Sequence, residues 1–458
     1  MTNRITSLLT GTPFVLILAL LMIVGRIIFA APPTTHPEAN CFIVHYNSGN
    51  NPINLIFDPS KTDWDNYQAR ELSYLLDYLD ARFIFFCILQ HHAHFYSLSS
   101  LILLTASAVL IHRKLKKLYP DADKSITAAL PLMYVSLYLG ADGFFRSSKP
   151  AVSFLLLWLF LNVAEMLKQP EKYHSIRSQF PNLLLLFLLP GFDRIGFFIA
   201  AAASAAAALL PGLFSCNCPL ASREKMDSSK KPLLIFSFIA LSAVLFSLLY
   251  NFIIAPAIIE ALHSYRPSFE YQNFQASVSN ILCDGLIFTL KNYGSLFIPA
   301  NYSGTIAAGI ICSLFLFYAG AILRRDSRDL RLITPVWLGI FVSSVICTGL
   351  MIARHPAIQE LPPGSYFQVF GTAFFGIFAT IFLESSHISI RRTFVIMMIT
   401  VFATSFCRLA MPQPATELLL HKQTAGHTIE LLNDPQMASK EYLPASSGML
   451  IRFVRQYQ

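Results

Sequence analysis

Charged residues are scarce in this chain of 458 residues. Asp, Glu, Lys and Arg together make up 13% of it, whereas soluble globular proteins carry about 25%. Hydrophobic residues make up 54%, and they are gathered into blocks close to the roughly 20 residues that a helix needs to cross the hydrocarbon core of a bilayer. This composition excludes an ordinary soluble protein and indicates an integral membrane protein.

Nucleotide-binding motifs are also missing. The sequence contains no G-x-x-x-x-G-K-[ST], and no G-x-G-x-x-G that opens a helix after a strand. The formal net charge is +8, but the basic residues stand in short loops between apolar blocks, where they signal topology rather than nucleic-acid binding. We therefore exclude an ATP-driven pump and a cytoplasmic sugar-nucleotide enzyme, and expect no nucleic-acid partner and no cofactor.

Metal-ligand spacing is absent as well. Cys216 and Cys218 form a C-N-C without a second pair at zinc spacing. His91 and His94 share a face at helical spacing, but no carboxylate stands at matching positions. We expect no metal site.

The apolar blocks predict an all-α, polytopic membrane bundle of about 11 spans. The first block, Pro13 to Ala31, is longer than the roughly 7–15 apolar residues of a signal-peptide core, so we interpret it as a retained helix. The spans are expected near residues 13–32, 95–112, 125–142, 150–167, 182–192, 196–214, 233–255, 304–322, 332–352, 367–384 and 393–410.

The basic residues predict the orientation of these spans. With a cytoplasmic N-terminus, the inward segments carry 19 of the 34 Lys and Arg residues, as the positive-inside rule requires. Residues 1–410 then form the membrane domain, whose first loop, 33–94, lies outside. Residues 411–458 form an outer-face tail, too short for a confident core of its own.

The first outer loop contains a segment with unusual chemistry. An apolar stripe at steps of three and four predicts an amphipathic helix over about residues 65–90, of a kind that can lie along the membrane surface. Asp63 and Asp65 precede it. With Thr62, Asp65 resembles a helix-capping box, but either carboxylate is also suited to take a proton from an acceptor hydroxyl. The stripe is formed by Leu72, Leu75, Leu76, Leu79, Phe83 and Phe86.

This segment resembles the GT-C class of membrane glycosyltransferases, especially the bacterial serotype-converting glucosyltransferase group. In that group the first outer loop often reads Asp-Asp-Trp, then an aromatic residue and Gly-Arg-Pro-Leu leading into an amphipathic helix. This chain has Thr62-Asp63-Trp64, then Tyr67, then Ala69-Arg70-Glu71-Leu72. Thr62, Ala69 and Glu71 depart from the pattern, and the likeness covers about twenty residues and the arrangement of spans.

The resemblance implies a GT-C-like fold in a bacterial cytoplasmic (inner) membrane. It also implies transfer of a sugar, on the outer face, from a polyprenyl-phosphate donor to a glycan or lipid-linked acceptor. Asp63 is then the first choice for the catalytic base and Asp65 the second. The leaving phosphate needs cationic donors, for which arginine is well suited. The candidates for substrate binding are Arg70, Glu71, Arg146, Arg194, Arg354 and His355.

Several of these candidates have structural explanations. The sequence around Arg146 fits a tight polar turn between spans as well as it fits a phosphate clamp, and Asp193-Arg194 fits an ion pair in a hairpin. Arg354-His355 opens a loop whose rigid aromatic end, Tyr366-Phe367, suits an interfacial anchor or a sugar contact.

Two other functions also fit a chain of many spans. A polysaccharide polymerase or ligase acts on the same lipid-linked glycans, but usually with arginines in large later outer loops. A flippase or transporter catalyses no reaction, and for it we would expect charged residues near mid-membrane and broken helices.

Overall fold

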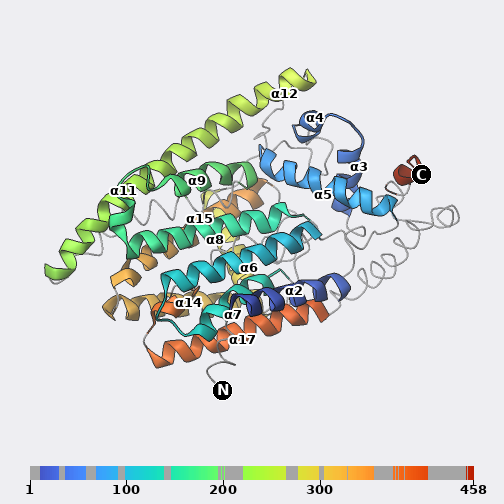
Figure 1. Ribbon diagram of the computed structural model, residues 1–458. Coiled ribbons are helices and arrows are strands. Elements are labelled where there is room, and N and C mark those ends of the chain that lie inside the picture. Colours follow the sequence, from blue (N-terminus) through green and yellow to red (C-terminus); the bar gives the residue numbers. More distant parts are fainter. Residues whose placement is uncertain are drawn as a thin grey trace.

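The chain is almost entirely helical (Figure 1). The computed structural model describes residues 11–29, 37–57, 69–90, 98–138, 146–193, 198, 201, 220–264, 277–298, 304–326, 328–354, 375–376, 378–379, 381–385, 387–410, 450 and 452–457. Within these ranges there is no β-strand. The expected all-α class is therefore confirmed for the described part of the chain.

Most helices run side by side in one bundle (Figure 1). The largest apolar core joins α2, α6, α7, α8, α9, α11, α13, α14, α15 and α17. The bundle helices are α2 (Thr12–Phe29), α6 (Leu98–Leu118), α7 (Lys124–Ser136), α8 (Ser148–Lys168), α9 (Phe180–Phe192), α11 (Leu220–Leu249), α12 (Ala255–His263), α13 (Val278–Gly294), α14 (Gly304–Asp326), α15 (Arg328–Arg354) and α17 (Ile388–Ala410).

Four helices of the described part are long and apolar enough to cross a membrane. They cover Leu98–Leu118, Ser148–Lys168, Lys231–His263 and Ile388–Cys407. Shorter apolar stretches occupy Thr12–Gly25, Phe180–Phe192, Gly304–Leu316 and Gly339–Ala353. The blocks expected at 196–214 and 367–384 lie largely outside the described residues. The structure therefore supports helices that can span a membrane, but does not establish eleven spans.

The third span expected from the sequence is shorter than a bilayer requires. The apolar block 125–142 corresponds to α7, which has 13 residues and contains Pro131. The block 182–192 corresponds to α9, also of 13 residues. Such helices cover about 20 Å at 1.5 Å per residue, less than the roughly 30 Å of hydrocarbon.

The segment between the expected spans 233–255 and 304–322 is partly helical. It contains all of α12 except its first residue and the whole of α13, which packs against α14 and α15. Glycine makes this close packing possible, because a Cβ at Gly285 would overlap the carbonyl oxygen of Val345, and one at Gly294 the carbonyl oxygen of Thr305. Small residues allow the same approach between membrane helices.

Basic residues gather at the end of the bundle where α6 and α8 end. Lys114 and Lys117 of α6 pair with Glu165 near the end of α8, and Lys168 pairs with Glu384. Helix α8 has 21 residues, and its opposite end begins at Ser148. Exposed cations at the basic end are Arg113, Lys116, Lys117, Lys124 and Lys172.

A second, smaller layer covers the opposite end of α8. It consists of α3 (Pro37–Asn47), α4 (Pro52–Ile56) and α5 (Glu71–Leu89), drawn in blue at one end of the bundle in Figure 1. The C-terminal segment packs on this layer: the ring of Phe85 lies 5.5 Å from that of Phe453 and 5.4 Å from that of Tyr457. The first loop and the C-terminus therefore lie together.

Candidate functional site

Helix α5 turns its polar face towards the protein. Glu71, Asp77 and Asp80 are buried on it, whereas Leu79 and Phe86 are more than half exposed, at 53% and 60%. The stripe recognised in the sequence is thus the outer face of the helix. In a membrane protein this arrangement is stable, because hydrocarbon solvates leucine while buried acids require partners inside the protein.

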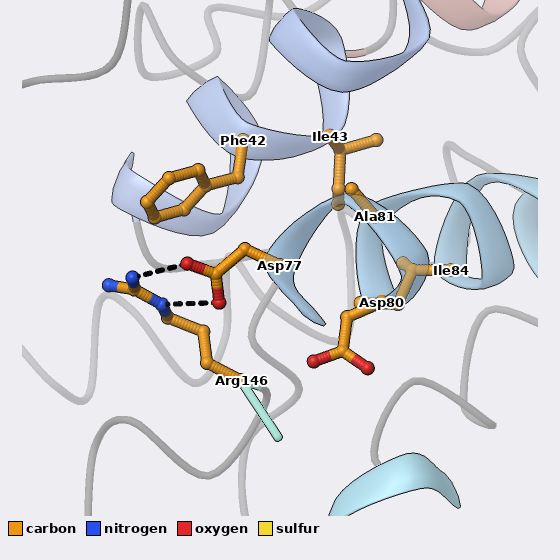
Figure 2. A pocket seen from close by; sticks show the side chains of 7 residues that line it. All are labelled: Phe42, Ile43, Asp77, Asp80, Ala81, Ile84 and Arg146. Atoms are coloured by element: carbon orange, nitrogen blue, oxygen red, sulfur yellow. Dashed lines mark hydrogen bonds and ion pairs between the residues drawn. The ribbon is translucent and has the colours of Figure 1, made fainter. Parts of the chain in front are cut away.

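Asp77 forms a buried ion pair with Arg146 (Figure 2). The arginine Nε donates to Oδ1 at 3.0 Å and Nη2 to Oδ2 at 2.6 Å, which is the two-point geometry of a strong arginine–carboxylate contact. The hydroxyl of Ser148 donates to Oδ1 at 2.8 Å. The ring of Phe42, from α3, lies 4.4 Å from the guanidinium carbon. Asp77 and Arg146 are only 2% and 4% exposed.

Asp80 stands one turn further along α5 than Asp77 (Figure 2) and contacts the start of α8. Its Oδ2 accepts the backbone N–H of Ser147 at 2.6 Å. The side chain of Ser147, at the N-cap position of α8, makes no capping hydrogen bond. Carboxylates of α5 therefore bind the first turn of α8, where free N–H groups and the helix dipole favour negative charge.

The environment of Asp80 disfavours its ionised form. Burial raises the pKa of the Asp80 carboxyl to about 6, and the nearby charge of Asp77 raises it as well, while hydrogen bonding from Ser99 and Ser147 opposes these effects. Burial also raises the pKa of Tyr46, on α3, well above its ordinary value, so that this side chain is a neutral phenol. Asp80 thus differs from Asp77, which has a cation as partner.

A small cavity opens between α3, α5 and Arg146. It is lined by both aspartates and has room for about one water molecule. It is too small for a sugar. The other lining residues are Phe42, Ile43, Ala81, Ile84 and Arg146.

Arg70 immediately precedes α5 and is less completely buried than Arg146. Its Nε donates to the hydroxyl of Tyr74 at 3.3 Å, and its guanidinium carbon lies 5.5 Å from the centre of that ring. Its two terminal nitrogens have no hydrogen-bond partner among the described residues. Arg70 can therefore offer a fork of donors to an anion, which Arg146 does not while it holds Asp77.

Glu71 has a structural partner instead of an open position. Its Oε2 accepts the hydroxyl of Tyr250 at 2.9 Å. Tyr250 begins a π-helical turn, η6 (Tyr250–Ile254), between α11 and α12. Glu71 therefore links α5 to the longest apolar helix of the described part.

The remaining predicted site residues are not placed by the structure. Asp63, Asp65, Arg194 and His355 lie outside the described residues. Arg354 is the last residue of α15, and its side chain also lies outside the description. Of the six predicted binding residues, Arg70 and Glu71 are adjacent on α5, and Arg146 contacts the same helix two turns further on.

The start of α5 bears on the two interpretations of Asp63 and Asp65. The helix begins at Glu71, with Arg70 at the N-cap position, and not near residue 65 as the apolar stripe suggested. A capping side chain binds N–H groups two or three residues further on. Asp63 and Asp65 are therefore too far along the chain to occupy the N-cap of α5.

Sequence reasoning did not select Asp77, Asp80 or Ser148. The available signal was the polar face of the helix, where two acids stand three residues apart, together with the Arg146-Ser147-Ser148 turn. Both features were visible, but their pairing across 69 residues has no sequence pattern of its own.

Among the described residues no group of three His, Cys, Asp or Glu side chains could hold a metal ion. Comparisons with protein-family models, with curated proteins and with solved structures give no match for this chain.

Proposed function

We propose that this protein is a membrane glycosyltransferase that moves a sugar from a polyprenyl-phosphate donor to a cell-surface glycan or lipid-linked acceptor on the outer face of a bacterial inner membrane. Asp63 is the catalytic base in this proposal, and Arg70 binds the phosphate of the donor. The observation that carries it is the position of Arg70. Among the described residues the terminal nitrogens of this arginine make no hydrogen bond, and it stands after the acidic segment, at the start of a helix with an apolar outer face.

The geometry of α5 supports a substrate that is held in the bilayer. Leu75 and Leu79 are exposed on one face of this helix, while Arg70 stands at its first turn. A lipid phosphate at the membrane surface would meet both features together, because its chain needs apolar surroundings and its head needs a cation. The bidentate fork of arginine suits the charge that develops on the leaving phosphate.

The start of α5 supports a chemical role for Asp63. Since Arg70 occupies the N-cap position, the capping explanation no longer accounts for an acid seven positions earlier in the sequence. For Arg146, in contrast, a structural role is sufficient, because its guanidinium makes a two-point contact with buried Asp77. We therefore assign phosphate binding to Arg70 in preference to Arg146.

The test is transfer of radiolabelled sugar from polyprenyl phosphate by the full-length protein in proteoliposomes. We expect Asp63→Asn to abolish transfer and Arg70→Ala to reduce it by at least tenfold, the equivalent of about 1.4 kcal/mol. The matched control is Arg82→Ala on the same helix, because Arg82 donates to the carbonyl of Gly49 and lies away from the first turn. Full transfer by Asp63→Asn, or equal losses for both arginine variants, would refute the assignment.

One observation favours the transport alternative. The longest apolar helix contains the π-helical turn Tyr250–Ile254, and interruptions of this kind often mark functional sites in membrane helices. A flippase would move a fluorescent polyprenyl-phosphate sugar across the bilayer without changing it. The same proteoliposomes distinguish the two functions, because transfer yields a new glycan and flipping returns the original lipid. A polymerase or ligase would instead join preformed glycan repeats, and this chain would then show no single-sugar transfer.

A further inference from the structure

The junction between α5 and α8 contains a buried acid that forms no ion pair with any described residue, namely Asp80. Asp77 and Asp80 are both buried, and Arg146 is the one cation that forms an ion pair with either of them among the described residues. Its guanidinium makes a two-point contact with Asp77. Asp80 is left with a neutral donor, the backbone N–H of Ser147.

Within the described ranges no second cation forms an ion pair with Asp80. Helix α5 contributes Asp77, a like charge, and α3 contributes the apolar Phe42 and Ile43 at the cavity together with the neutral Tyr46 nearby. The start of α8 contributes Arg146 and the backbone of Ser147. The uncompensated negative charge of Asp80 is costly in this place, and a buried acid in that position usually binds a proton instead.

The buried hydroxyl of Tyr46 near the cluster has no hydrogen-bond partner among the described residues. The hydroxyl of Ser99, near the start of α6, lies close to the Asp80 carboxyl, and its interaction with the ionised form lowers the pKa of that carboxyl. An ionised Asp80 can only accept hydrogen bonds, whereas a protonated one has an O–H to donate. The cavity beside Asp77 and Asp80 has room for about one water molecule as a further acceptor.

We propose that Asp80 is a proton-binding site, which takes up one proton while Arg146 stays paired with Asp77. The ligand is a proton from water, and uptake converts the carboxylate into a carboxylic acid without any change in bonds between heavy atoms. Protonated Asp80 keeps its contact with Ser147 through the carbonyl oxygen and directs its O–H towards the cavity or Ser99. The cluster of Asp77, Asp80 and Arg146 thereby carries no net charge.

The proton on Asp80 can be observed directly by infrared spectroscopy. Protein in lipid nanodiscs is titrated between about pH 4 and pH 8, a range that includes the ordinary aspartate pKa of about 3.9. The carbonyl stretch of protonated carboxyl groups is then followed. Wild-type protein should lose one aspartic acid band with a midpoint near 6. Asp80→Asn should lack this band, whereas Asp121→Asn, which changes an exposed acid at the far end of the bundle, should retain it.

Asp77→Asn should shift the titration midpoint of Asp80 in a defined direction. It removes the like charge beside Asp80 and frees the Arg146 fork to pair with it, so the midpoint should fall by about one pH unit or more. Labelling of aspartate carboxyl carbons with ¹³C separates this band from those of glutamate and needs no variant. Persistence of the band in Asp80→Asn, or a wild-type midpoint close to 4, would overturn the proposal. The outcome is independent of sugar transfer, since no substrate is present.

Discussion

Removing either partner of the Asp77–Arg146 pair alone should strongly destabilise the protein. The pair is almost completely buried, with exposures of 2% and 4%, and Arg146 also lies against the ring of Phe42. Asp77→Asn leaves the guanidinium buried without its carboxylate, and Arg146→Gln leaves two buried acids without a cation. Each single change should cost about 3–5 kcal/mol, as is usual when one partner of a buried pair is lost.

The double variant Asp77→Asn/Arg146→Gln should cost clearly less than the sum of the two single changes. Neither side chain is charged in the double variant. In the wild-type protein the hydroxyl of Ser148 donates to Asp77 Oδ1, and the amide oxygen of an asparagine at position 77 can still accept this hydrogen bond. Replacing both members of a buried ion pair by neutral groups is often tolerated. We expect a coupling free energy above about 1.5 kcal/mol in this double-mutant cycle.

The cycle is measured by thermal unfolding in detergent, followed by tryptophan fluorescence and by the labelling of newly exposed thiols. The matched control is Lys117→Ala at the other end of the bundle. The Lys117 side chain is 68% exposed, and its partner Glu165 keeps Lys114, so the cost should stay within about 1 kcal/mol. If Asp77→Asn cost no more than this control, or if the cycle showed no coupling, the pair would not hold α5 to α8.

Three further outcomes follow from the same structure. Gly285→Ala should destabilise the protein by about 1–3 kcal/mol or more, because its Cβ meets the carbonyl of Val345, whereas Gly25→Ala, with nothing within 4 Å, should be neutral or slightly stabilising; thermal unfolding of both variants decides this. The pKa of Asp80 is about 6 in the folded protein and about 3.9 in the unfolded chain. The contribution of Asp80 to stability should therefore be largest below pH 4 and should be lost, by up to about 3 kcal/mol, as the pH rises through 6. Asp80→Asn should remove this pH dependence in thermal unfolding measured at each pH. Because Phe453 packs on Phe85, reporter fusions placed in the first loop and at the C-terminus should report the same side of the membrane, and opposite sides would contradict this packing.

The sequence predicted the helical class well because hydrophobic blocks dominate the chain. The same pattern could not distinguish a spanning helix from a shorter buried one, since α7 and α9 are as apolar as spans but have 13 residues each. It also hid α13, whose Asp284, Lys291 and Asn292 interrupt the apolar run. Tertiary packing through glycine backbones, which supports this helix, has no signature in hydropathy.

The candidate site shows a similar division. Periodicity alone identified the two faces of α5, and the direction in which each face points depended on what surrounds the helix. A leucine stripe faces inward in water and outward in lipid. Because Leu79 is exposed and Asp77 is buried, the acids on the polar face of α5 lie inside the junction with α8. Arg146 was recognised as either a turn residue or a clamp, and only the fold supplied its partner.

The start of α5 at Glu71 makes the role of Asp63 separable by experiment. A capping aspartate stabilises its helix by about 0.5–2 kcal/mol, so its loss lowers stability and activity together. Since Arg70 occupies the N-cap position, Asp63→Asn should leave the unfolding free energy within about 0.5 kcal/mol of wild type while sugar transfer disappears. Asp65→Asn should leave the unfolding free energy similarly unchanged and retain part of the transfer. A stability loss of 1 kcal/mol or more in Asp63→Asn, on the order of a lost cap, with transfer falling only in proportion to folded protein, would return this residue to a structural role.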